Sequence, residues 1–525
     1  MTVPPTASSK VPPPKAWLGT ARSLAETAAT SFPRSAYLTD RDVAVLVTHG
    51  MGQQVRYETL EQAAGLLHRA VQSRDPIVLR RVMLGEQEVT RAEVRYLDLS
   101  KQSRTAHVYE TYWAPLTEGK VGLKDVFLFL QQAAVAGFRR TFREFDRWMF
   151  GQWHRFRINL TSSFGFLAAL LVIVSLGLTN AVVGAVVTSG ALLATVTGWP
   201  TPALLSDLTV DLTLFLGAAL LALIAVWLSA WWGARRLPLQ GAITWVAWRF
   251  VWLSLLTTMA LGFAVAWQLW LHHEGDVLFF WSPRVRHGLL FADLYARWKT
   301  DEFLHLGVVW GLALIVSYFV RKFLIQYVGD VAAYVSAHTV SRFDELREEI
   351  RARAFTLARA VYHARGSRPD TLAYERVIVL GHSLGSVIAY DTLNALMRQE
   401  TLAAKRCWVE ARTKLFLTFG SPLDKIAFVF RSQAKGRLDV REAAAATMQP
   451  LIEDYAFRPQ RWVNLFTPND WIGGSLEYFD NPQDALYSAQ GVKNELDTEA
   501  TTPLAAHSEL WSGTLLAKHL AAAVR

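Results

Sequence analysis

The chain has 525 residues, a formal net charge of +9 and a single cysteine, Cys407, so an intramolecular disulfide is excluded. A lone cysteine is compatible with a reducing compartment, and the length allows two or three domains. Hydrophobic residues make up 52% of the chain and charged residues 19%, whereas soluble domains carry about a quarter charged residues. The apolar excess is concentrated between residues 164 and 320.

The first part of the chain predicts a tail followed by strands. Residues 1–39 are rich in Pro and Ser and have no apolar run after the first basic residue, so we expect a disordered N-terminal tail and no signal peptide. Residues 43–47 (VAVLV) predict a buried strand that ends at Thr48-His49-Gly50. Further strands are expected within 77–98 and 105–113. We therefore expect residues 40–120 to form the N-terminal part of an α/β domain.

A basic segment follows. Residues 121–160 predict a helix whose second half interleaves arginines with large aromatic residues. Such a helix, placed before an apolar stretch, is typical of a juxtamembrane helix on a membrane surface; the solvated face of an ordinary helix is the alternative. Because the arginines lie beside apolar segments, anionic lipid headgroups explain the basic charge better than nucleic acid does. They are Arg139, Arg140, Arg143, Arg147, Arg155 and Arg157.

Four apolar stretches predict a transmembrane domain over residues 161–325. Each is long enough to cross about 30 Å of hydrocarbon, and the distribution of Lys and Arg favours both termini in the cytoplasm. We therefore expect a multi-pass protein of a bacterial-type inner or plasma membrane with a cytoplasmic catalytic domain. The first stretch stays uncharged as far as Ser206, which leaves open whether it crosses once or twice. The stretches are 164–187, 212–232, 250–271 and 303–320, and connecting helices are expected over 326–370.

The sharpest signal lies after this region. Residues 376–380 (RVIVL) predict a strand, Gly381-His382-Ser383-Leu384-Gly385 follows at once, and a helical pattern comes next. This strand–turn–helix context is the one that a nucleophile elbow requires. The glycines are needed because the turn is too tight for a Cβ beside the strained serine backbone. The sequence therefore predicts Ser383 as a nucleophile, with an incidental Gly/Ser turn as the alternative.

A serine nucleophile needs a base and an orienting carboxylate, which follow it in the order acid, then histidine. Asp470 lies just after a predicted strand at 462–466 (WVNLF) and is the expected acid. Asp424, one strand earlier, is the alternative acid. His507 is the expected base, because His519 falls inside a predicted terminal helix, where a side chain is more often packed or solvated.

An oxyanion hole needs two backbone N–H donors. The first is expected to be the amide of Leu384, directly after the nucleophile. His49-Gly50-Met51-Gly52 follows the first predicted strand, and the amide of Met51 is the expected second donor. Two parts of one catalytic apparatus therefore occur in the expected order along the chain.

These segments resemble lipase-type members of the α/β-hydrolase superfamily. The resemblance lies in THGMG, VIVLGHSLGSVIAYD, LTFGSPLD, NLFTPNDWIGG and AHSELW, and covers about 40–115 and 370–525. It implies a mostly parallel sheet flanked by helices, with residues 371–525 as the C-terminal part of the hydrolase domain. It also implies hydrolysis of an ester or lipid ester without a metal or cofactor. The chain departs from the superfamily in the long apolar region between the first strands and the elbow.

The sequence thus predicts a membrane-anchored serine hydrolase that cleaves an acyl ester, expected to be a lipid. Membrane lipids and the ester are the expected partners, with no nucleic acid, metal or cofactor. Two alternatives stay open. One is a membrane scaffold or channel-like protein whose inactive hydrolase domain senses a ligand, and the other is an acyltransferase that uses the same triad.

Overall fold

The computed structural model describes most of the sequence before and after the apolar region, and only isolated positions at the end of that region. The described residues are 39–52, 54–140, 144–157, isolated positions between 311 and 325, 328–335, 341–368, 371–403, 406–433, 440–470, 472–480, 490–502 and 505–525.

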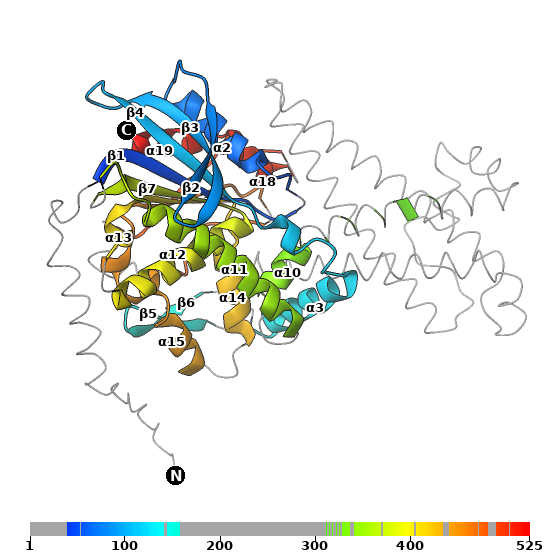
Figure 1. Ribbon diagram of the computed structural model, residues 1–525. Helices are drawn as coiled ribbons and strands as arrows, with labels where there is room; N and C mark the ends of the chain where they lie inside the picture. Colours follow the sequence, from blue (N-terminus) through cyan, green and yellow to red (C-terminus); the bar gives the residue numbers. More distant parts are fainter. Residues whose placement is uncertain are drawn as a thin grey trace, which may run out of the picture.

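An eight-stranded sheet forms the centre of the described structure (Figure 1). Its order is β10-β9-β8-β7-β1-β4-β3-β2. The strands from β10 to β4 run parallel, and β3 and β2 extend them in antiparallel fashion. The described residues thus form a mixed α/β structure with a mostly parallel sheet, and the predicted combination of this sheet with a helical transmembrane domain is corrected below. The strands are β1 Thr39–Thr48, β2 Val78–Leu84, β3 Gln87–Leu97, β4 Ser103–Thr111, β7 Leu372–His382, β8 Thr413–Phe419, β9 Trp462–Phe466 and β10 Val492–Leu496.

Strands from distant parts of the chain are neighbours at the middle of this sheet. β1 pairs with β7, with Val47 opposite Leu380 and Thr48 opposite Gly381. Because the strands are parallel, the loops that follow β1, β7, β8, β9 and β10 all emerge at one edge of the sheet. In open α/β sheets this carboxyl edge is where ligands bind.

Helices cover both faces of the sheet (Figure 1). α2 (Glu58–Ala70) and α19 (Thr514–Val524) pack on one face, and α11 (Ser341–Tyr362) and α12 (Leu384–Leu402) pack on the other. The segment VAVLV of β1 alternates between these cores, because successive side chains of a strand point to opposite faces: Val43, Val45 and Val47 join the first, and Ala44 and Leu46 the second.

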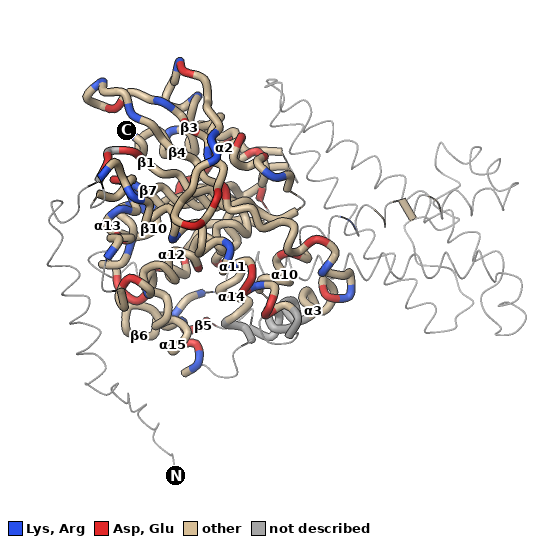
Figure 2. Tube along the Cα trace, viewed as in Figure 1, with Lys and Arg blue, Asp and Glu red and all other residues tan. Residues whose placement is uncertain are grey.

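Shorter elements complete the described structure. Acidic and basic residues lie on the helices and loops and on the strands β2 and β3 (Figure 2), while residues 43–48 of β1 and 377–382 of β7 carry no Lys, Arg, Asp or Glu. The remaining helices and strands named below are α3 Leu123–Arg140, β5 Phe145–Met149, β6 Gln152–Phe156, α10 Gly329–Val335, α14 Leu423–Gln433 and α18 Ala506–Glu509.

The segment predicted as one basic helix over 121–160 contains two different structures. α3 accounts for its first half, but β5 and β6 form an antiparallel hairpin in the second. Arg147 is buried, donates a hydrogen bond to the Tyr478 carbonyl and lies 4.3 Å from the centre of the Phe479 ring. The prediction of a helix is wrong there, because the aromatic and arginine side chains pack against the α/β domain.

The prediction of about four membrane spans, and with it of a multi-pass protein of an inner or plasma membrane, is corrected. Among the described residues no helix is long and apolar enough to cross a bilayer. Among the longest ones, α11 and α12 carry charged residues along their length, and α3 carries them near both of its ends, whereas a span needs about 20 predominantly apolar residues. Of the predicted stretches, 164–187, 212–232 and 250–271 lie outside the described residues, and 303–320 is described only at Gly311, Leu314, Ile315 and Tyr318.

Candidate active site

Ser383 occupies a sharp turn between β7 and α12. Its backbone has φ 54° and ψ −132°, a conformation that costs free energy in a residue with a side chain and that is typical of functional sites. The turn is closely packed. A Cβ at Gly381 would lie 2.4 Å from the Ser386 Cα, and one at Gly385 would lie 2.2 Å from the Thr48 carbonyl oxygen. Both positions therefore require glycine, as the sequence predicts.

Hydrogen bonds hold the backbone of Ser383 but, within the part of the chain that the structure describes, not its hydroxyl. Its N–H donates to the Phe419 carbonyl at 3.0 Å, and its carbonyl accepts from the Ser386 hydroxyl at 2.6 Å. The Ser383 Oγ is buried and has no hydrogen-bond partner among the described residues. A buried polar atom without a partner is rare in folded proteins and calls for an explanation, of which a catalytic role is one.

Asp470 and His507 form a direct pair. The loop after β9 places the Asp470 Oδ2 2.8 Å from the His507 Nδ1 at the start of α18. Burial opposes ionisation of Asp470, but the charge and hydrogen bond of His507, together with the backbone N–H groups of Gly473 and Ile472, lower its pKa to about 2. An ionised Asp470 accepts the Nδ1 proton and so leaves the Nε2 of His507 to act as a base.

His382 connects the nucleophile turn to the base. Its Nε2 lies 3.1 Å from the His507 carbonyl oxygen, to which it donates, and the two imidazole rings are 4.7 Å apart between centres. Burial, with the charge of His507, lowers the pKa of His382 to about 3, so the ring is neutral. The Ser383 Oγ itself makes no hydrogen bond to His507 among the described residues. Nucleophile–base hydrogen bonds are often longer before substrate binds.

The loop after β1 passes directly beside the nucleophile. A Cβ at Gly50 would lie 2.7 Å from the Ser383 Cβ, and Met51, the next residue, is buried. Leu384 is the first residue of α12, and a first-turn N–H of a helix has no acceptor within the helix. Of the two amides predicted as oxyanion donors, that of Leu384 therefore follows Ser383 directly in the chain, and that of Met51 follows Gly50, which packs against Ser383.

His49 shapes this loop and is not available as a base. The Trp113 N–H donates to its Nε2 at 3.0 Å, so its Nδ1 carries the proton and donates to the Gly50 carbonyl at 2.8 Å. The ring also stacks on Trp113 with 4.8 Å between centres. Burial lowers the pKa of His49 to about 4, which keeps it in the neutral form that both bonds require.

The alternative residues lie elsewhere. Asp424, in the first turn of α14, accepts hydrogen bonds from the N–H groups of Glu477 and Tyr478 at 2.8 and 3.2 Å. Burial raises its pKa to about 7. His519 is buried in α19, where it contacts Glu495 at 2.8 Å and Arg461 at 3.0 Å. The structure thus brings Asp470, not Asp424, to His507, and it leaves His519 in a packed helix.

Sequence reasoning missed residues that support the site. The Ser386 hydroxyl contacts the Ser421 hydroxyl at 2.7 Å, which joins the nucleophile turn to the loop after β8. Lys425 donates to the Gly473 carbonyl at 3.1 Å, beside the Asp470 loop. Asp330 accepts from the Gly52 N–H in the loop after β1. Ser421 and Lys425 lie in the LTFGSPLD neighbourhood and could have been found there, whereas nothing near Asp330 signals its role.

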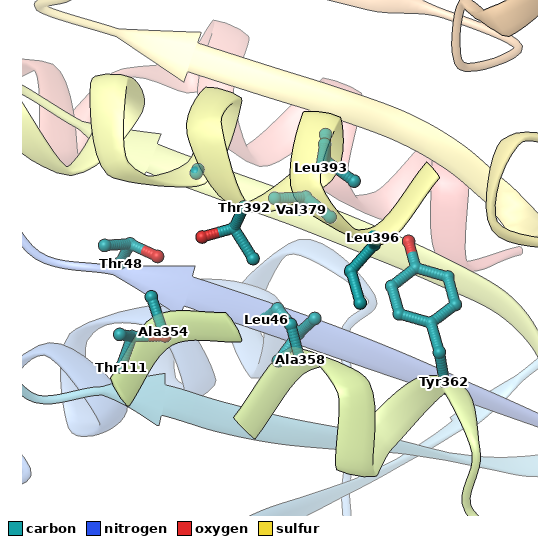
Figure 3. A pocket seen from close by; sticks show the side chains of 11 residues that line it. Leu46, Thr48, Thr111, Ala354, Ala358, Tyr362, Val379, Thr392, Leu393 and Leu396 are labelled. Carbon is teal, nitrogen blue, oxygen red and sulfur yellow. The ribbon is translucent and has the colours of Figure 1, made fainter. Parts of the chain in front are cut away.

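A small cavity lies where α11 and α12 face β1 and β7 (Figure 3). Its volume is about 10 Å³, room for about one water molecule. Leu46, Val379, Leu393 and Leu396 supply much of its apolar lining, with Thr48 near its edge. A cavity of this size is a packing gap and not a substrate chamber.

Comparisons of the chain with protein-family models, curated proteins and solved structures find no match. Its mostly parallel sheet does not identify a family either, because unrelated activities share such sheets. Among the described residues, no group of three or more His, Cys, Asp or Glu side chains is placed to hold a metal ion. The functional argument therefore depends on the geometry around Ser383.

Proposed function

We propose that the chain is a serine hydrolase that cleaves acyl esters with Ser383, His507 and Asp470 as its catalytic triad. The observation that carries the proposal is the 2.8 Å contact between His507 and Asp470, at the sheet edge where the buried Ser383 hydroxyl has no partner among the described residues. The strained turn at Ser383 supports it further. The α/β-hydrolase resemblance agrees with this chemistry and stays part of the proposal.

The reaction proceeds in two halves. The Ser383 Oγ attacks the ester carbonyl carbon and gives its proton to the His507 Nε2, while Asp470 stabilises the imidazolium. The amides of Met51 and Leu384 bind the oxyanion, and loss of one such donor lowers kcat about 10²- to 10³-fold. The intermediate expels the alcohol, which takes the proton from His507, and leaves an acyl-serine. Water then attacks the acyl carbon with His507 as base, and the carboxylic acid departs.

Hydrolysis of a chain-length series of p-nitrophenyl esters, from acetate to palmitate, tests this function. We expect turnover that Ser383→Ala abolishes and that Ser512→Ala, at an exposed serine bonded to the Glu509 carbonyl, leaves unchanged. The series also asks whether long, lipid-like acyl chains are preferred. Equal rates of ester hydrolysis for wild type and Ser383→Ala would contradict the proposal.

Acyl transfer is a second candidate, because the Ser383 side chain lies at 0% exposure and a site closed to water favours an alcohol as acceptor. Adding an acceptor alcohol to the ester assay separates the two reactions. Formation of the new ester at the expense of the free acid would identify transfer, and free acid as the sole product would identify hydrolysis.

A further inference from the structure

The loop after β1 is tied to a helix from a distant part of the chain. The Gly52 N–H donates to the Asp330 Oδ2 at 2.9 Å, across 278 positions of sequence. Asp330 lies in the first turn of α10 and is buried, with 7% of its surface exposed. This bond attaches the loop to α10 one residue after Met51, whose N–H is the proposed oxyanion donor.

A buried carboxyl at this place is costly. Burial raises the pKa of Asp330 to about 6, and among the described residues the groups that oppose the rise are the Gly52 N–H and the Thr117 side chain. Neither is a cation, so the carboxylate has dipoles as its stabilising partners. An apolar residue would fill the position at lower cost in folding free energy. The hydrogen bond to Gly52 is therefore the feature that distinguishes Asp330 from a core residue.

The Met51 amide lies between two fixed points. On one side Gly50 is packed against Ser383, where an added Cβ would be 2.7 Å from the Ser383 Cβ. On the other side Gly52, at φ 96°, is held by Asp330. A peptide group can turn only if its neighbours move with it, so holding both ends restricts the direction of the Met51 N–H.

α10 is in turn anchored to the helix that carries the nucleophile. One turn after Asp330, the Tyr334 hydroxyl donates to the Asp391 Oδ2 of α12 at 2.7 Å, and Arg351 of α11 donates to the same oxygen at 2.9 Å. At the start of α10, a Cβ at Gly329 would lie 3.1 Å from the Val121 Cγ1. The hydrogen bonds thus connect the loop after β1, through α10, to α12 and so to the turn at Ser383.

We propose that Asp330 is a positioning residue, which holds the loop after β1 so that the Met51 N–H points at the oxyanion formed on Ser383. The inference rests on the proposed function and adds a residue to it. Asp330 touches no substrate; it acts through the backbone of Gly52. Because an oxyanion donor acts on the transition state more than on bound substrate, loss of Asp330 lowers kcat and leaves KM nearly unchanged.

The test compares Asp330→Ala, Asp330→Asn and the matched control Asp98→Ala by steady-state hydrolysis of p-nitrophenyl butyrate. Asp98 also accepts backbone N–H groups, from Ser100 and Gln102, but it lies next to the start of β4, at the opposite edge of the sheet. The concentration of active sites is titrated with a fluorophosphonate left to react to completion. Each kcat therefore refers to folded enzyme alone.

We expect Asp330→Ala to lower kcat roughly tenfold to a hundredfold, part of the full loss of an oxyanion donor, with KM within about threefold of wild type. Asp330→Asn recovers most of the rate, because its amide oxygen accepts the Gly52 N–H, and Asp98→Ala matches wild type. A kcat for Asp330→Ala within twofold of wild type, or no recovery in Asp330→Asn, overturns the positioning role while the proposed function stands. A wild type that neither turns over nor reacts with the fluorophosphonate removes both.

Discussion

Two aspartates at the same edge of the sheet show how a carboxylate's partner decides its chemistry. Asp424 follows β8 and Asp470 follows β9, and both accept hydrogen bonds from backbone N–H groups. Burial raises the pKa of Asp424 to about 7, whereas the pKa of Asp470 is lowered to about 2. The difference is His507, whose imidazole contacts Asp470 at 2.8 Å. Position after a strand does not distinguish the two residues; the ionisable neighbour does.

The largest expected effect separates the two aspartates by activity. Asp470→Asn removes the carboxylate that orients His507 and stabilises its positive charge, and we expect kcat to fall by about 10⁴. Asp424→Asn keeps an acceptor for the 477–478 backbone and should stay within about threefold of wild type. Steady-state hydrolysis of p-nitrophenyl butyrate measures both. A larger loss in Asp424→Asn than in Asp470→Asn would reverse the assignment of the acid.

The second expected effect is on the pH dependence of stability. The folded pKa of Asp424, about 7, lies above its ordinary value of 3.8, so between these values the folded state binds a proton that the unfolded state has lost. By linkage, this carboxyl's contribution to the free energy of unfolding falls as the pH rises from about 4 to 7, by at most about 1.4 kcal/mol per pH unit. The carboxyl is only partly buried, so solvent screening makes the fall smaller.

Urea unfolding at several pH values, with Asp424→Asn beside wild type, measures that slope. The asparagine variant cannot titrate at this position and should gain stability relative to wild type as the pH rises. If the two curves run parallel between pH 4 and 7, Asp424 does not carry a raised pKa.

A third effect has the opposite sign and concerns a buried base. His49 is held neutral, with its pKa lowered by burial from 6.5 to about 4. Below pH 6.5 the unfolded state gains a proton that the folded state does not, so stability is lost as the pH falls from 6.5 to 4, on the order of 3 kcal/mol in all. His49→Asn should flatten this acid limb of the unfolding free energy. An equally steep limb in the variant would show that other groups cause it.

The smallest expected effect tests the side chain that links the two aspartate loops. Lys425 donates to the Gly473 carbonyl beside Asp470, and one hydrogen bond is worth about 1 kcal/mol. We expect Lys425→Met to lower kcat roughly fivefold and Lys425→Gln, which keeps a donor, to lower it less. Identical rates in both variants would mean that the bond to Gly473 has no influence on the acid.

Local patterns in the sequence were sufficient for the centre of the site. A few residues are enough to predict the strand ending at Thr48, the turn with glycines around Ser383 and the loop after WVNLF. This is because tight turns and buried strands restrict which residues fit. The pairing of Asp470 with His507 follows from the order of strands and loops. The sequence favours Asp470 over Asp424 by position alone, whereas the contact of Asp470 with His507 distinguishes the two aspartates in the structure.

Other parts of the fold depend on contacts that no short window contains. β10 (VKNEL) is a polar strand at the sheet edge and has no apolar run to reveal it. The hairpin of β5 and β6 presents arginines and aromatics that pack on Tyr455, Tyr478 and Phe479. A membrane-surface helix would have the same amino-acid composition, so composition alone does not distinguish the two structures. The bond from Gly52 to Asp330 spans most of the chain.

The most direct test of the triad is to locate the adduct that the protein forms with a fluorophosphonate. Peptide mass spectrometry of the labelled wild type should place the phosphonyl group on the Ser383 Oγ, and His507→Ala should slow its formation by orders of magnitude. A stable, folded protein that gains no adduct at residue 383, or gains it equally fast without His507, would contradict the account.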